Sequence, residues 1–154
     1  MAFAVVRVRG RVGVRRDIEE ALKRLRLTRV NHCVVVPETE TFKGLIQKAK
    51  DFITWGEVDH DTLKELLLRK GEFEDGAPVT EETLKEKTGT DVETFVKKVL
   101  SGEIVLSHVG IKPFRLHPPS GGYERRGIKY PYTLGGALGY RGDAINALLR
   151  RMMK

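Results

Sequence analysis

The first 58 residues alternate between short apolar runs and helical stripes, and no other feature of the chain constrains the fold as much. Residues 3–8 (FAVVRV), 33–36 (CVVV) and 52–58 (FITWGEV) are rich in β-branched and aromatic side chains, which is typical of strands. Between these runs, apolar residues recur at the spacing of one helical face. They are Ile18, Ala21, Leu22 and Leu25, then Phe42, Leu45, Ile46 and Ala49. The pattern predicts an α+β fold with a compact β-α-β-α-β core, in which a three-stranded sheet carries two helices on one face.

Residues 59–104 are predicted to form an acidic helical extension of this core. Two apolar stripes, one around Leu66 and one around Phe95, predict helices. Thr62 and Thr90 are each followed three residues later by a glutamate, which fits a capping box at a helix start.

Residues 105–154 are predicted to form a basic extended segment and a C-terminal helix. The stretch from Gly110 to Gly142 holds four of the six prolines and eight of the sixteen glycines. Because such a stretch makes few regular backbone hydrogen bonds, we expect it to be largely mobile in the free protein and ordered on RNA. An apolar stripe after Asp143 predicts the last helix.

Charge divides the chain into the same three blocks. The whole chain has 28 Lys+Arg and 21 Asp+Glu, a net charge of +7. Residues 1–58 carry 12 basic and 7 acidic residues, residues 59–104 carry 7 and 12, and residues 105–154 carry 9 and 2. The blocks therefore have net charges of +5, −5 and +7. This order predicts that the two ends meet a polyanion while the middle faces away from it.

Nucleic acid is a better candidate for that polyanion than a membrane. No apolar run approaches the roughly 20 residues of a spanning helix, and the charged N-terminus predicts a strand and not a signal peptide. Cys33 is the only cysteine, so no intrachain disulfide can form, and we expect a cytoplasmic protein. Only three amide side chains accompany 32% charged residues, which is typical of a thermophile composition.

The chain lacks the residue patterns of an enzyme or a metal site. Its four histidines are not at metal-ligand spacing, and neither G-x-x-x-x-G-K-[ST] nor G-x-G-x-x-G occurs. Cys33 lies inside an apolar strand and is interpreted as a small buried hydrophobe. Residues 59–61 (Asp-His-Asp) are interpreted as capping acids at a helix start and not as an acid/base cluster. We therefore predict no catalytic residue, no metal and no cofactor.

Basic side chains carry the candidate RNA contacts. Arginine outnumbers lysine by eight to one in residues 1–30, and its planar guanidinium suits phosphate contacts and base stacking. In the Gly/Pro-rich stretch, arginines interleaved with tyrosines suit backbone tracking and stacking. The alternative for each residue is a solvated surface position. The predicted RNA-binding residues are Arg7, Arg9, Arg11, Arg15, Arg16, Arg26, Arg29, Lys43, Lys48, Lys50, Lys112, Arg115, His117, Arg125, Arg126, Lys129, Tyr130 and Arg141.

Three motifs within residues 3–58 resemble one ribosomal protein family. They are R-x-R-G, L-R-L-x-R-x-N-x-C and G-x-x-Q-K-x-K-D-x-x-T-W-G. The family is the large-subunit protein numbered thirty in bacteria and archaea and seven in eukaryotes, and beyond residue 58 the chain resembles the archaeal form. The resemblance implies a β-α-β-α-β core and no catalysis. It also implies a single copy on the cytoplasmic ribosome, in contact with the large ribosomal RNA, with 5S RNA nearby and with neighbouring large-subunit proteins.

Two other functions are alternatives. A free RNA-binding regulator or RNA-maturation accessory factor would use the same basic surfaces outside the ribosome, and cosedimentation with large subunits through high-salt washing separates these two functions. A small α/β enzyme would need a pocket with convergent acids of perturbed pKa.

Overall fold

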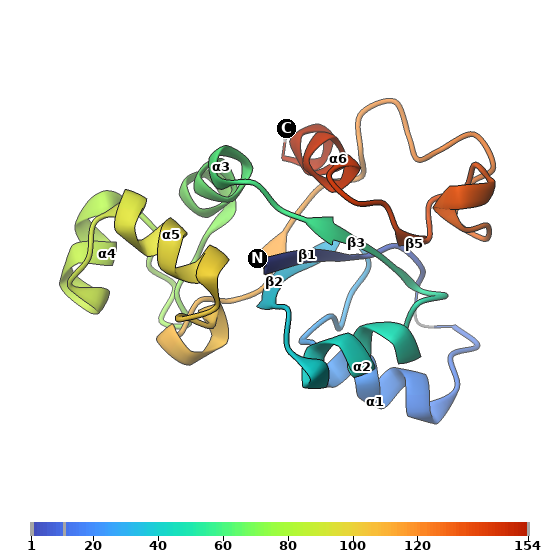
Figure 1. Ribbon diagram of the computed structural model, residues 1–154, viewed down its shortest axis with the longest axis horizontal. Coiled ribbons are helices and arrows are strands. Elements are labelled where there is room, and N and C mark those ends of the chain that lie inside the picture. Colours follow the sequence, from blue (N-terminus) through green and yellow to red (C-terminus); the bar gives the residue numbers. More distant parts are fainter. Residues whose placement is uncertain (1, 11, 154) are drawn as a thin grey trace.

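The computed structural model of the chain describes residues 2–10 and 12–153, and it contains the predicted β-α-β-α-β core. Its elements are β1 (Ala2–Arg7), α1 (Arg16–Arg24), β2 (His32–Pro37), α2 (Glu40–Lys48) and β3 (Ile53–Glu57). Strand β1 lies between β2 and β3 and is antiparallel to both. Helices α1 and α2 cover one face of the sheet, as predicted (Figure 1).

The three strands predicted for the core are present, but the sheet has five, because two further strands that were not predicted join its edges. Its order is β4-β2-β1-β3-β5, and both edge strands come from the Gly/Pro-rich stretch. β4 (Phe114–Arg115) is antiparallel to β2, and β5 (Gly139–Tyr140) is parallel to β3. Each edge strand has two residues, which is too short to produce the alternation by which a strand is recognised in a sequence.

Both faces of the sheet are buried, each in its own hydrophobic core. Val5 and Val34 face the core beneath α1 and α2, whereas Ala4, Val6 and Val35 face a second core on the other side. Successive side chains of a strand point to opposite faces. Burial of both faces therefore explains why these strands are continuously apolar in the sequence instead of alternating.

The second core is formed by helices that follow the β-α-β-α-β unit. α3 (His60–Lys70), α5 (Val92–Ser101) and α6 (Ala144–Met152) contribute buried side chains to it, and the 3-10 turn η1 (Leu106–Val109) contributes Leu106 (Figure 1). α4 (Glu81–Thr88) was not predicted, because Leu84 is the one buried side chain within it. A second 3-10 turn, η2 (Tyr132–Leu134), lies in the Gly/Pro-rich stretch. No helix in the described part of the chain is long and apolar enough to cross a membrane.

Aspartates cap the two helices for which capping boxes were predicted, so those predictions were wrong. Asp59 accepts a hydrogen bond from the backbone N–H of Thr62 (2.7 Å), and Asp91 accepts one from that of Thr94 (2.9 Å). Thr62 lies inside α3, and Thr90 precedes the cap of α5. An ionised carboxylate is a stronger acceptor than a hydroxyl and also interacts favourably with the helix dipole, which explains why the aspartates take the cap positions.

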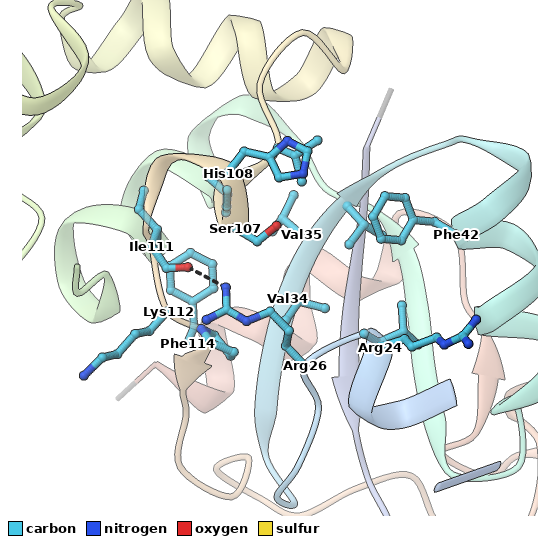
Figure 2. A pocket seen from close by; sticks show the side chains of 15 residues that line it. Arg24, Arg26, Val34, Val35, Phe42, Ser107, His108, Ile111, Lys112 and Phe114 are labelled. Carbon is cyan, nitrogen blue, oxygen red and sulfur yellow. Dashed lines mark hydrogen bonds between the residues drawn. The ribbon is translucent and has the colours of Figure 1, made fainter. Parts of the chain in front are cut away.

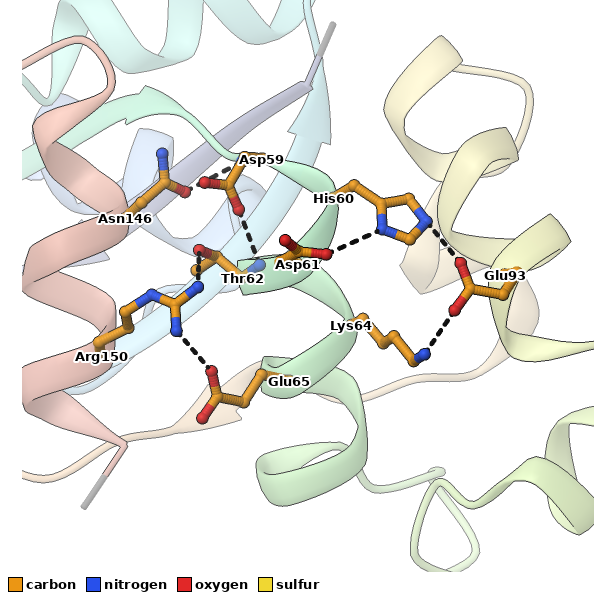
Figure 3. A network of polar contacts seen from close by, with 9 residues as sticks. All are labelled: Asp59, His60, Asp61, Thr62, Lys64, Glu65, Glu93, Asn146 and Arg150. Carbon is orange, nitrogen blue, oxygen red and sulfur yellow. Dashed lines mark hydrogen bonds and ion pairs between the residues drawn. The ribbon is translucent and has the colours of Figure 1, made fainter.

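A network of polar contacts joins α3 to its two neighbouring helices (Figure 3). His60 Nε2 lies 3.0 Å from the Glu93 carboxylate of α5, and Lys64 pairs with the same carboxylate. On the other side, Arg150 of α6 donates a hydrogen bond to Glu65 (3.0 Å). These side chains are therefore occupied in contacts between helices, and the described residues contain no group of three or more His, Cys, Asp or Glu that could hold a metal ion.

Both ends of the Gly/Pro-rich stretch are fixed to the core, contrary to the expectation that it is largely mobile without RNA. At one end, Phe114 and Leu116 are buried in the second core. At the other end, Ala137 and Leu138 pack against Val8 at the end of β1. The apolar residues of the stretch are thus buried by packing against other parts of the chain, which the composition of the stretch alone does not predict.

A buried arginine anchors the second of these ends. Arg141 is 6% exposed, and its guanidinium donates hydrogen bonds to Glu124 (2.5 and 3.2 Å), to the Thr54 hydroxyl (2.8 Å) and to the Ala137 carbonyl (2.8 Å). It also lies over the ring of Tyr132, 4.7 Å from the centroid. Acceptors, and above all a carboxylate, offset the cost of removing a guanidinium from water. The fold provides them by bringing residues 54, 124, 137 and 141 together.

We predict that Glu124→Gln lowers the free energy of unfolding by about 2 kcal/mol or more, because it leaves the Arg141 charge buried without its counterion. Chemical denaturation monitored by circular dichroism measures the change. Glu103→Gln is the control; it removes an exposed carboxylate and should change stability by less than about 0.5 kcal/mol. Equal stability of the two variants would show that the ion pair does not hold the stretch on the core.

Gly56, the last residue of the T-W-G motif, permits a close approach between β3 and the start of α6. A Cβ atom at this position would lie 1.9 Å from the Gly142 carbonyl oxygen and 3.0 Å from Ile145 Cβ. The nearest of these atoms belongs to the backbone and cannot rotate away. The motif glycine is therefore explained by the packing of the C-terminal block on the sheet.

We predict that Gly56→Ala lowers the free energy of unfolding by at least about 2 kcal/mol, since the added methyl group forces the C-terminal block away from β3. Gly44→Ala is a matched control. Nothing lies within 4 Å of a Cβ at Gly44, which is inside α2, so alanine there should stabilise the protein by about 0.5–1 kcal/mol. Thermal and denaturant unfolding of both variants measures the difference, and destabilisation of the same size in both would contradict the packing argument.

Candidate RNA-binding surface

The predicted RNA-binding residues that are exposed lie mainly in two regions of the surface. We call the first the β1–α1 end; it comprises residues 9–10 and 12–16, the C-terminal end of α2 and the loop 120–137 (Figure 1). We call the second the β2–β4 edge; it comprises residues 26–32 and 112–115. Each region combines residues from both basic blocks of the sequence.

At the β1–α1 end, Arg9 is held by the start of β3. Its guanidinium lies over the Phe52 ring, 4.7 Å from the centroid, and donates a hydrogen bond to the Asp51 carbonyl (3.3 Å). Arg15 is exposed and makes a 3.6 Å contact with Asp17. The other predicted residues of this region, all exposed, are Arg16, Lys48, Lys50, Arg125, Arg126, Lys129 and Tyr130.

The loop 120–137 presents basic and apolar groups together. Arg126 lies over the Tyr130 ring, 4.9 Å from the centroid, and donates a hydrogen bond to the Leu134 carbonyl (3.4 Å). Ile128 and Leu134 are exposed, at 37% and 57%. One face of the Tyr130 ring is therefore covered by a guanidinium that can also reach a phosphate.

At the β2–β4 edge, strand pairing joins residues that are far apart in the sequence. His32 is the strand partner of Arg115, which brings the end of the N-terminal basic block beside the start of the C-terminal one. The Arg26 guanidinium donates hydrogen bonds to the Ile111 carbonyl (3.3 Å) of the C-terminal block and to the Glu74 carboxylate (3.1 Å). Linear sequence gives no signal of this juxtaposition, because it depends on a two-residue strand.

The pKa of His32 is lowered from its ordinary value of 6.5, first by burial and then by the charges of Arg115, Arg29 and Arg7. Its Nδ1 atom is buried and makes no hydrogen bond within the chain. The imidazole is therefore held neutral at neutral pH. Burial is the largest cause of the lowered pKa, and the neighbouring arginine charges of the β2–β4 edge lower it further.

Two predicted residues are buried and do not belong to this surface. Arg7 is 2% exposed and donates hydrogen bonds to the carbonyls of Leu27 (2.7 Å), Arg9 (3.0 Å) and Gly10 (3.3 Å). Arg141 is the buried anchor described above. Both guanidiniums contact protein groups, so we leave these two residues out of the candidate surface.

Three further predicted residues fall outside the two regions. Arg11 is not among the described residues. His117 is exposed and lies 3.2 Å from Lys70 Nζ of α3, on the side of the second core. Lys43 is exposed on α2 beside Phe42.

Sequence reasoning missed a hollow of about 260 Å³ that opens next to the β2–β4 edge (Figure 2). Its lining comes from five separate segments, residues 24–26, 34–36, 42, 105–108 and 111–114. No sequence window spans them, so no local pattern could have indicated the hollow.

The cysteine has no chemical role in this arrangement. Cys33 is fully buried in β2, and burial raises the pKa of its thiol, which keeps the thiol protonated and unreactive. Its interpretation as a small buried hydrophobe is confirmed.

Comparison with known proteins identifies the family. Residues 3–53 match the family model described as Ribosomal protein L30p/L7e. The large ribosomal subunit protein uL30 of Methanococcus maripaludis is 53% identical over 154 residues, which covers 99% of this chain and 100% of the relative. The chain belongs to the ribosomal protein L30p/L7e family.

Two further members of the L30p/L7e family extend the comparison. The uL30 protein of Methanopyrus kandleri is 54% identical over 149 residues (95% of this chain, 100% of the relative), and that of Nanoarchaeum equitans is 51% identical over 150 residues (97% of each). All three relatives span the acidic middle and the C-terminal block, which confirms the resemblance to the archaeal form of the family beyond residue 58. The L30p/L7e family consists of structural ribosomal proteins and not of enzymes.

We predict that Arg115→Gln raises the pKa of His32 toward 6.5, because it removes the positive charge that lowers this pKa most. Titration of the His32 ring proton by NMR measures the change, and Lys97→Gln, on the distant helix α5, is the control that leaves the pKa unaltered.

The same shift predicts how His32 affects stability. The unfolded chain binds the proton near pH 6.5, above the pKa in the folded protein, so the contribution of His32 to stability is lost progressively as the pH falls below 6.5. A His32 pKa that is the same in wild type and Arg115→Gln would contradict the electrostatic description of this edge.

Proposed function

We propose that the protein is a structural constituent of the large ribosomal subunit that binds ribosomal RNA through the β1–α1 end and the β2–β4 edge. The proposal includes one copy per subunit on the cytoplasmic ribosome, contact with the large ribosomal RNA near 5S RNA, and neighbouring large-subunit proteins. The observation that carries it is the β2–β4 edge, where the two basic blocks of the chain form one surface.

Arginine chemistry supports RNA as the ligand of these regions. Arg29 and Arg115 are exposed, and their charges are among the causes, after burial, that lower the pKa of His32. A polyanion neutralises such charges by releasing its own counterions and pairing with the guanidiniums. Exposed tyrosine and guanidinium planes in the loop 120–137 can stack on bases.

The charge pattern of the middle block supports different roles for the three blocks of the chain. We propose residues 1–58 as the ribosomal core, residues 59–104 as an acidic extension turned away from RNA, and residues 105–154 as a second RNA-binding block. Within the extension, Lys64 pairs with Glu93 and Lys87 with Asp75, so two of its few cations are already neutralised. Its remaining acids would repel phosphate.

We predict that affinity for large-subunit ribosomal RNA falls on the order of a thousandfold between 50 and 200 mM salt, as expected if six or more phosphates are contacted. The double variant Arg29→Glu/Arg115→Glu should bind more weakly, and the slope of log affinity against log salt should be smaller by about two. Filter binding or fluorescence anisotropy across a salt series measures both quantities.

The matched control is Lys85→Glu/Lys97→Glu, which reverses two exposed lysines in the acidic block and should leave affinity and slope near wild type. Cosedimentation with large subunits through a high-salt wash tests the ribosomal role. A salt-independent affinity, equal losses in the two double variants, or release of the protein from subunits in the wash would contradict the proposed function.

A further inference from the structure

We propose that the hollow beside the β2–β4 edge receives one unpaired base of the bound RNA, a proposal that rests on the RNA-binding function above. The hollow lies between β2, the end of α1 and η1, and its volume is about 260 Å³ (Figure 2). Pockets for drug-sized ligands have volumes of about 300–1,000 Å³. The hollow is thus suited to a single planar group and not to a helix or a strand.

The walls of the hollow are apolar and partly aromatic. Phe42 lies on one side, Phe114 on the other and Val34 between them (Figure 2), and Pro113 and Val36 also contribute to the lining. A base that leaves its own helix loses stacking with its neighbours, and aromatic side chains can replace that stacking in a sequence-tolerant way.

The rim of the hollow is cationic. Arg24, Arg26 and Lys112 contribute to it, and no carboxylate is among the described residues that line it. Just outside the lining, Glu72 lies 3.6 Å from Lys112, so part of the rim charge is balanced within the chain. A second, more open hollow shares Arg26 and Lys112 and continues past Arg115; its one acid, Glu74, is paired with Arg26. Phosphates on either side of an inserted base would therefore meet positive charge, whereas an apolar side chain from another protein brings no charge to match this rim.

Polar groups at the mouth can recognise the edges of a base. Ser107 and His108 of η1 are exposed there. β4 pairs with β2 at His32 and Cys33, so within the described residues the outer edge of residues 34–36 has no strand partner. η1 lies across this edge (Figure 2), which leaves room for a base and blocks the addition of a peptide strand.

The backbone at Arg26 also points to a role for its side chain. Arg26 has φ +64°, and the bonds from its N–H to the Lys23 carbonyl and from the Leu27 N–H to the Leu22 carbonyl (both 2.9 Å) end α1 in a Schellman motif. Glycine is the usual residue at this left-handed position. Arginine here is conformationally unfavourable, but its side chain reaches the Ile111 carbonyl and fixes one side of the hollow. Arg26 is thus a positioning residue for the proposed site.

Ultraviolet crosslinking of purified large subunits, followed by mass spectrometry of this protein, tests the proposal directly. The expected result is a nucleotide adduct on a peptide that contains Phe42 or residues 105–114. Adducts confined to the β1–α1 end and to residues 26–32 would overturn the base pocket and leave RNA binding intact. A chain without any adduct would contradict the proposed function as well, so the two failures are distinguishable.

A filling substitution gives a second, independent test. Ser107→Trp occupies the mouth of the hollow without touching the core, and we expect about tenfold weaker binding to in vitro transcribed large ribosomal RNA, in the range for loss of one stacked base. Its salt slope should equal that of wild type, because no phosphate contact is removed. Ser101→Trp, an equally exposed serine at the end of α5, is the control and should bind normally.

Phe42→Leu separates stacking from simple hydrophobic packing. Leucine keeps the wall apolar, so thermal unfolding should change little, whereas loss of the aromatic ring should weaken RNA binding several-fold. Wild-type affinity in both Ser107→Trp and Phe42→Leu would overturn the proposal. Crosslinking of a peptide from another ribosomal protein at Phe42 would do so too, since it would identify a protein side chain as the occupant.

Discussion

Burial of both faces of the central strand β1 is the constraint on which the rest of the structure depends. Ala4 and Val6 face one core while Val5 faces the other, so two layers of helices are needed. Residues 3–58 supply only α1 and α2, which cover one face. The second face would remain exposed to water without α3, α5 and α6, and apolar area of that kind is costly to hydrate. The acidic and C-terminal blocks are therefore structural parts of this chain and not appendages to a self-sufficient core.

Covering the second face also determines where the basic groups lie. The polypeptide pairs with β2 as β4 on its way to α6 and with β3 as β5, and it thereby covers part of each edge of the three-stranded core. The same two pairings bring Lys112 and Arg115 beside Arg26, and the loop 120–137 beside the end of β1. The addition of β4 and β5 to the sheet and the assembly of the candidate surface therefore both result from the same path of the polypeptide. Arg141 and Glu124 form a buried ion pair. Some charged residues of the C-terminal block therefore hold the chain in this path and are not available to bind RNA.

The sequence predicted the β-α-β-α-β core because its apolar residues follow two clear periods, and it predicted the family because three motifs occur in order. Periodicity failed where elements are short, as in β4 and β5, and where an amphipathic stripe is narrow, as in α4. Residue type predicted which groups can bind phosphate, but not which of them face inward. Arg7 and Arg141 differ from Arg115 only in their surroundings, which are determined by residues distant in the sequence. The hollow near Phe42 was inaccessible to sequence reasoning for the same reason.

The position of β1 has a consequence for biosynthesis. This central strand precedes the other described elements in the chain and is therefore synthesised before them, and its register with β3 is complete only when residue 57 has emerged. Its second face is fully covered only after the synthesis of α6, which packs in the second core and contacts β3. At roughly 5–20 residues per second, the last hundred residues take on the order of five to twenty seconds to synthesise. For that interval the helices that cover the second face of β1 are not all present, so the nascent chain exposes apolar surface that is buried in the finished protein.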